Sequence, residues 1–232
     1  MKVEKINYYK DLYKVHLKSD DTLSELFKYD SLMNFQSNWD LEALDFKDMF
    51  NRSFSSKISG RLWGGSVNSA KSIMLTFIEK HKEFVRSMFR DLLDEKKDVV
   101  MRMKRFTFHC DQLLRELQDI DKKVVVHRHN LRMISVYLGF VYPNVYTIYD
   151  YKSFAKCLKL FESKNVIEEF EIDKFFTMSR TLLTILSKDE ELVDAHRSRI
   201  KSSGVDIEDS LLLVHDFIEF NFLLPKSRIG EV

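Results

Sequence analysis

The sequence predicts a mainly α-helical protein, a compact multi-helix domain with at most a small β-hairpin element. The chain of 232 residues contains only six glycines and two prolines. Folds built from strands need many tight turns and hence many of these residues, so their scarcity favours long helices. A hydrophobic fraction of 44% with 31% charged residues provides material for one globular core, and nineteen phenylalanines make that core aromatic.

The first half of the chain shows helical patterning with one interruption. Thr22 and Glu25 have the spacing of a capping box at a helix start. The stretch SFSSKISGRLWGGSVNS (53–69) holds half of the glycines and many serines, which predicts a loop or an internal boundary. We therefore expect an N-terminal helical segment (1–58), a helical recognition module (59–224) and a domain edge or linker (225–232).

The clearest helix is expected over about 97–118, after two helices at about 69–81 and 82–95. Its apolar side chains recur at steps of four and three, which places them on one face. That face consists of Val99, Met103, Phe106, Cys110, Leu113 and Leu117, whereas Arg102, Arg105, His109 and Gln112 fall on the opposite side.

The second half is also mainly helical in pattern. A helix over 129–141 must end before Pro143, because the residue before a proline disfavours helical backbone. The following NVYTIYDY is β-branched and aromatic and suggests a short strand or hairpin arm. Ser187 and Glu190 again have capping-box spacing. The remaining helices are expected at about 152–162, 170–187, 189–200 and 207–222.

Charge and cysteine content indicate which cellular compartment and which kinds of partner the protein has. The formal net charge is +1, but residues 96–132 hold ten Lys and Arg against five Asp and Glu, and residues 162–219 hold seven against fourteen. The chain can thus present a basic face without a strong overall field. Two cysteines form no disulfide framework, no signal peptide is evident, and no apolar run is long enough to span a membrane. These features predict a cytoplasmic protein with no membrane partner.

Two segments imitate catalytic motifs without completing them. GSVNSAKS (65–72) lacks the second glycine of a phosphate-binding loop, because Ala70 stands in its place. VYTIYDYK (145–152) imitates a nuclease strand with Asp150 and Lys152 as its acid and base. A metal-dependent nuclease needs a second carboxylate to hold its ion, and Asn144 follows the proline instead. We therefore predict no catalytic residues in this chain.

A zinc site was the remaining possibility for a cofactor. His109, Cys110, His127 and His129 supply four donor types, but adjacent ligands followed by H-x-H do not fit the usual zinc spacings. Cys110 also belongs to the apolar face of its helix, which predicts an inert core thiol, and Cys157 has a similar context. We predict neither a metal nor a cofactor.

The basic segments KKDVVMRMKRF and KKVVVHRHNLRM predict the binding surface, provided that the chain between them turns back. Lys and Arg side chains contact phosphates, and aromatic side chains stack on bases. Solvated helix faces and core tyrosines produce similar patterns, so these residues remain candidates. The candidates for nucleic-acid binding are Arg102, Arg105, His109, Arg128, His129, Arg132, Trp63 and Tyr146.

Over roughly residues 60–220, the order of several motifs resembles the N-terminal specificity region that precedes the AAA+ motor in McrB-type restriction GTPases or ATPases. The stretches that carry the resemblance are LWGGSVNSAKSIMLTFI, RDLLDEKKDVVMRMKRF and ISVYLGFVYPNVYTIYDYKSF. The matching positions are Leu62, Trp63 and Gly64; Arg90, Asp91, Leu92 and Glu95; Arg102 and Phe106; and Tyr137, Leu138, Tyr142, Pro143, Tyr146 and Tyr149. The chain departs from the family where Asp150 replaces the usual lysine.

The resemblance implies a non-catalytic recognition domain of a phage-defence system. Its expected ligand is DNA, either modified or unmodified, and its expected partner is an AAA+ motor in cis or in trans. The alternative is a protein-interaction or assembly module that senses a phage protein or positions the motor. Convergence of the two basic segments on one face would favour DNA. A scattered arrangement, or burial of the arginines in ion pairs with residues 162–219, would favour a protein partner.

Overall fold

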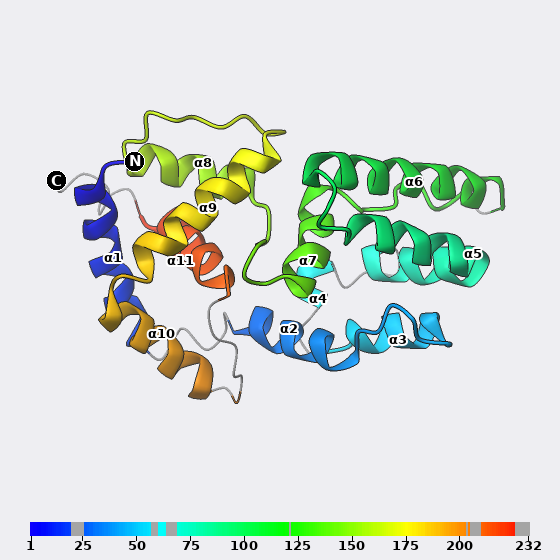
Figure 1. The fold of residues 1–232 in the computed structure, drawn as a ribbon, viewed down its shortest axis with the longest axis horizontal. Coiled ribbons are helices and arrows are strands. Elements are labelled where there is room, and N and C mark those ends of the chain that lie inside the picture. Colours follow the sequence, from blue (N-terminus) through cyan, green and yellow to red (C-terminus); the bar gives the residue numbers. More distant parts are fainter. Residues whose placement is uncertain are drawn as a thin grey trace. The chain divides into compact units, whose positions relative to one another are not determined.

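A computed structural model describes residues 1–19, 26–56, 60–63, 69–120, 122–202, 204 and 210–225 (Figure 1). These residues form eleven helices and no strand, which confirms the predicted fold class. None of the described helices is both long and apolar enough to cross a membrane. The helices are α1 (Val3–Leu17), α2 (Phe27–Asn38), α3 (Phe46–Ser53), α4 (Gly60–Trp63), α5 (Ala70–Leu92), α6 (Val99–Ile120), α7 (Leu131–Val141), α8 (Tyr151–Leu160), α9 (Ile172–Leu186), α10 (Glu190–Ser202) and α11 (Leu212–Leu223).

The chain divides into two compact units. Unit 1 combines Met1–Leu26 with Pro143–Val232, and unit 2 is the continuous stretch Phe27–Tyr142. The boundary that we expected near residue 58 falls inside unit 2. Sequence patterns alone did not indicate that the first helix belongs with the last four, because such pairing depends on contacts between distant segments.

In unit 1, α11 packs against α1, α8 and α9, and α10 packs against α1. Helix α11 is apolar on nearly all sides, and a helix of that kind is stable only when its neighbours cover it. The Phe217 ring stacks on Phe161 with ring centroids 5.7 Å apart and meets Tyr13 edge-on at 5.5 Å. Aromatic side chains from three segments therefore close this core.

Unit 2 is built around the antiparallel pair of α5 and α6, which lie side by side in Figure 1. Helix α3 packs against α2 and α5, and α7 packs against α2, α4 and α6. Phe89 of α5 occupies the centre of an aromatic cluster in which every ring centroid lies within 6.2 Å of its own. The surrounding rings are Trp39, Phe46, Phe50, Phe106 and Tyr137.

Helix α5 contains the break that the sequence predicted between two helices. Its backbone is non-helical at His81, with φ −136° and ψ 48°. The helix starts where the Ser69 side chain accepts a hydrogen bond from the Ser72 N–H at 3.2 Å. The expected helix over 97–118 is confirmed as α6, and its predicted apolar stripe from Met103 to Leu117 is buried.

The expected strand at NVYTIYDY is absent, since none of the described residues there pairs with another strand. Residues 146–150 have no regular secondary structure, and two of their side chains contact helix α9. Tyr146 meets Phe176 edge-on at 4.9 Å, and Tyr149 meets Phe175 at the same distance. The aromatic and β-branched character of this segment therefore reflects burial against a helix rather than sheet pairing.

The predicted capping box at Ser187 is also wrong. Ser187 ends α9, because its N–H donates to the Leu183 carbonyl at 2.8 Å. Asp189 caps α10 instead and accepts from the Leu192 N–H at 3.1 Å. The other predicted capping box, at Thr22 and Glu25, lies outside the described residues.

The aromatic cluster predicts a large stability difference between two phenylalanines of unit 2. Phe89→Ala should lower the free energy of unfolding by about 3–5 kcal/mol, because it removes the buried central ring. Phe108→Ala should change it by less than about 0.5 kcal/mol, since Phe108 is 55% exposed. Urea unfolding followed by tryptophan fluorescence reports on this unit, which contains both tryptophans of the chain. Equal effects of the two changes would contradict the packing described here.

Candidate functional site

The non-helical segment 122–130 folds back along α6, as the binding prediction required. Gln118 Nε2 donates to the Val124 carbonyl at 3.0 Å. Further along, His127 Nε2 lies 3.1 Å from Asp111 Oδ1 in the middle of α6. The two basic segments are therefore neighbours within unit 2. Whether they can bind a ligand depends on the exposure of each arginine and on its contacts within the protein.

Arg102 and Arg105 are engaged within the protein. Arg102 is 1% exposed, and its Nη1 donates to the Leu92 carbonyl at 2.7 Å and lies 2.7 Å from Glu95 Oε1. Arg105 Nε lies 2.8 Å from Asp91 Oδ2, and this contact holds the pKa of the Asp91 carboxyl below its ordinary value. Both guanidinium groups join α6 to the end of α5, which counts against their predicted role at phosphates.

Arg132 and Arg128 differ in exposure. Arg132 is half-buried, and its Nη1 donates to the Leu62 carbonyl at 3.2 Å. Arg128 is exposed, and within the described part of the chain its side chain makes no hydrogen bond or ion pair. Its backbone has φ 60°, a left-handed conformation that few residues other than glycine adopt. Of the four candidate arginines, Arg128 is the one whose side chain is exposed and makes none of these contacts within the described residues.

The candidate aromatic side chains are both buried. Trp63 is 8% exposed and meets the Phe54 ring edge-on at 5.1 Å. Tyr146 is packed against Phe176 in unit 1, whereas all the other candidates belong to unit 2. Neither ring presents a free face for base stacking in this structure.

The two candidate histidines have separate environments. His109 is half-buried, its Nδ1 lies 3.0 Å from Gln112 Oε1, and the exposed rings of Phe84 and Phe108 meet it edge-on. His129 is fully buried, so it belongs to the interior rather than to a binding surface.

The residues that imitate catalytic motifs have structural contacts. Lys71, the lysine of the near-match to a phosphate-binding loop, donates through Nζ to the Phe54 carbonyl at 2.9 Å. Asp150 caps α8 by accepting from the Ser153 N–H at 3.1 Å and from its hydroxyl at 2.9 Å. Residues 65–68 of the near-match lie outside the described part of the chain.

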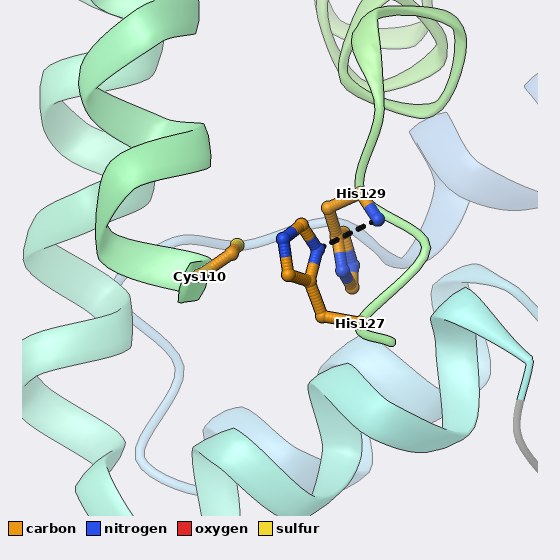
Figure 2. A group of neighbouring side chains, drawn as sticks. All are labelled: Cys110, His127 and His129. Carbon is orange, nitrogen blue, oxygen red and sulfur yellow. Dashed lines mark hydrogen bonds between the residues drawn. The ribbon is translucent and has the colours of Figure 1, made fainter. Parts of the chain in front are cut away.

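The interior of unit 2 contains a group that sequence spacing did not suggest. Cys110 of α6 points towards His127 and His129 of the returning segment, as Figure 2 shows. One donor atom from each residue lies within 4.8 Å of the others, and all three residues are buried. His109, the fourth residue of the zinc set that we considered, is not part of the group. The sequence signal was H-x-H with one cysteine, and the missing information was the reversal of the chain after α6.

Hydrogen bonds fix both imidazoles. His127 Nδ1 accepts from the His129 backbone N–H at 2.9 Å, while His127 Nε2 contacts Asp111. His129 Nε2 lies 3.0 Å from the Tyr137 hydroxyl, and His129 Nδ1 is buried without a hydrogen-bond partner. Burial lowers the pKa of His129 to about 3 and raises that of the Cys110 thiol. In the absence of another ligand, His129 is therefore a neutral imidazole and Cys110 a thiol at neutral pH.

The chain matches no protein-family model, no curated protein and no solved structure. Its function must therefore be inferred from the residues and contacts described above.

Burial of His129 predicts sensitivity to acid. Desolvation lowers its pKa from 6.5 to about 3, so between these values the unfolded chain binds a proton that the folded chain excludes. The free energy of unfolding should therefore fall as the pH drops through this window. One such group contributes about 1.4 kcal/mol per pH unit. Urea unfolding at several pH values should show that His129→Gln flattens the slope by this amount, and an unchanged slope would contradict the assignment.

Proposed function

We propose that this chain is a non-catalytic recognition module of a McrB-like restriction system and that it binds DNA through segment 122–130. The observation that carries the proposal is Arg128, an exposed guanidinium on a segment folded against α6. Lys122 and Lys123 are exposed on the same segment. Three cations on one non-helical stretch can follow a phosphate backbone.

The backbone of Arg128 gives further support. Its φ of 60° costs energy in a residue with a side chain, and conformations of this kind are concentrated at functional sites. The residues on either side, His127 and His129, are buried, so the turn directs Arg128 outward between two anchored neighbours. A positioned arginine loses less conformational freedom when it meets a phosphate than one on a freely moving loop.

This proposal assigns fewer residues to DNA contacts than the sequence predicted. Arg102 and Arg105 stabilise the connection of α5 to α6, and Trp63 packs in the core. Replacing Trp63 would consequently test folding rather than base stacking. We assign the phosphate contacts to Lys122, Lys123 and Arg128 and leave base recognition unassigned.

A protein partner is the second candidate, and a specific observation favours it. Phe84 of α5 is 41% exposed and Phe108 of α6 is 55% exposed, and both rings touch His109. Adjacent exposed aromatic rings are typical of protein-binding surfaces. Internal pairing of Arg102 and Arg105 also fits this class. An AAA+ motor in cis or in trans is the partner that the resemblance implies.

The DNA proposal predicts salt-dependent binding with a modest slope. Modified and unmodified duplexes and single strands should be titrated at about 50 and 200 mM salt. Each neutralised phosphate contributes about −0.9 to the slope of log K against log salt, so three cations should give roughly −2 to −3. Arg128→Ala should weaken all duplexes about equally and reduce the slope by nearly one unit.

Lys188→Ala provides the control, because Lys188 is an exposed cation of unit 1. It should leave both affinity and slope unchanged. Absence of binding at about 50 mM salt by protein with helical circular dichroism would refute the DNA proposal, since electrostatic attraction is strongest at low salt. The protein-partner candidate would then remain, and Phe108→Ala would be the variant with which to pursue it.

A further inference from the structure

We propose that Cys110, His127 and His129 form a binding site for one thiophilic transition-metal ion of the Zn²⁺ or Cu⁺ type. The inference is independent of the proposed DNA binding. It assigns a ligand to Cys110, which the sequence pattern placed in an inert core, and to two histidines that were expected at a surface.

The donor set defines the chemical class of the ion. One sulfur and two imidazole nitrogens suit soft and borderline cations such as Cu⁺ and Zn²⁺, whereas Mg²⁺ and Ca²⁺ require oxygen ligands. The donor atoms lie within 4.8 Å of one another. Metal–ligand bonds of about 2.0–2.3 Å place neighbouring donors roughly 3.5 Å apart, so the three side chains must close by about an ångström.

The independent observation is the orphaned nitrogen of His129. Its Nδ1 is buried with no hydrogen-bond partner, and its side chain lies beside the other two donors (Figure 2). A buried polar atom without a partner is uncommon and calls for a ligand. When Nε2 donates its proton to the Tyr137 hydroxyl, Nδ1 carries the lone pair that a metal requires. Metal-binding histidines commonly have such an outer hydrogen bond.

His127 needs one exchange before it can bind. Its Nε2 contacts Asp111 and its Nδ1 accepts from the His129 backbone N–H, so both nitrogens are engaged. Metal binding replaces one of these hydrogen bonds with a metal–nitrogen bond. The remaining hydrogen bond keeps the ring oriented, as an outer partner does in other metal sites.

The binding step releases one proton. The hydrated ion loses water ligands, the Cys110 thiol transfers its proton to solvent, and one metal–sulfur and two metal–nitrogen bonds form. Each histidine binds through the lone pair of one imidazole nitrogen. The bound group has a net charge of zero with Cu⁺ and of +1 with Zn²⁺. The ion would tie α6 to segment 122–130 through the two residues that flank Arg128.

The test uses the full chain, purified without metal, and titrates it separately with Zn²⁺ and with Cu⁺ under anaerobic conditions against a chromophoric chelator. We expect one equivalent to bind, with release of one proton from the thiol. X-ray absorption at the metal edge should report one sulfur and two nitrogen donors in the wild-type protein. Cys110→Ser and His129→Gln should each lower the metal affinity at least about 100-fold. Removal of a residue that only hydrogen-bonds to a metal ligand costs up to about 100-fold. These two variants remove a ligand itself, so their loss should be at least as large.

Cys157→Ser and His109→Gln are the matched controls. Cys157 is the other buried thiol, and His109 adjoins Cys110 but lies outside the group. Both variants should bind one equivalent like the wild type. The edge spectrum of the wild type gives a result even if Cys110→Ser does not fold.

Two outcomes would overturn the proposal. One is failure of the folded wild-type chain to bind either ion. The other is a bound ion with nitrogen and oxygen donors but no sulfur. The latter result would point to His215, Asp216 and Glu219 of unit 1, a second group of neighbouring donors that contains no cysteine.

Discussion

The arrangement of unit 2 depends on one buried hydroxyl group. Tyr137 is 1% exposed and is surrounded by aromatic rings that offer its hydroxyl no hydrogen bond. A hydroxyl in such surroundings is strongly destabilising unless a polar group reaches it. His129 supplies that group, and it brings segment 122–130 into the core. His127, which contacts Asp111, and the outward turn at Arg128 lie directly before this contact in the same segment.

A second constraint connects the motifs that the sequence resemblance singled out. Two of the three acidic residues of RDLLDE, Asp91 and Glu95, pair with Arg105 and Arg102 of the next helix. The Leu62 carbonyl accepts from Arg132, and the Tyr142 hydroxyl donates to the Leu93 carbonyl at 2.7 Å. Several positions of these motifs thus contact one another or other residues of unit 2, and these contacts give them a structural role that requires no ligand.

The helices could be predicted because their signals are local. The apolar stripe of α6 and the end of α7 before Pro143 depend on residues a few positions apart. The segment 146–150 was misread because β-branched and aromatic residues are equally suited to packing against a helix, and the difference lies in α9. Ser187 and Asp189 are both suitable N-cap residues for α10, and they lie two positions apart. The structure uses the Asp189 carboxylate as the cap, whereas Ser187 ends α9.

The candidate site was less predictable because its features arise between segments. Arg102 carries a charge and lies outside the stripe pattern, yet Glu95 and Leu92 enclose it, and no local pattern indicates that burial. The fully buried His129 was likewise expected at a surface. Cys110 was correctly placed in the core, but its neighbours His127 and His129 depend on the path of the chain after α6. Sequence thus indicated the residue types at the site but not which of them meet.

The discontinuity of unit 1 has a consequence for how the chain emerges from a ribosome. Helix α1 is synthesised before unit 2, but its packing partners α10 and α11 are synthesised after unit 2. Unit 2, by contrast, is a single uninterrupted stretch and can fold as soon as its own residues are complete. The apolar face of α1, which includes Ile6, Tyr9 and Tyr13, therefore stays uncovered while unit 2 is made. During that interval α1 is the natural segment for a chaperone to hold.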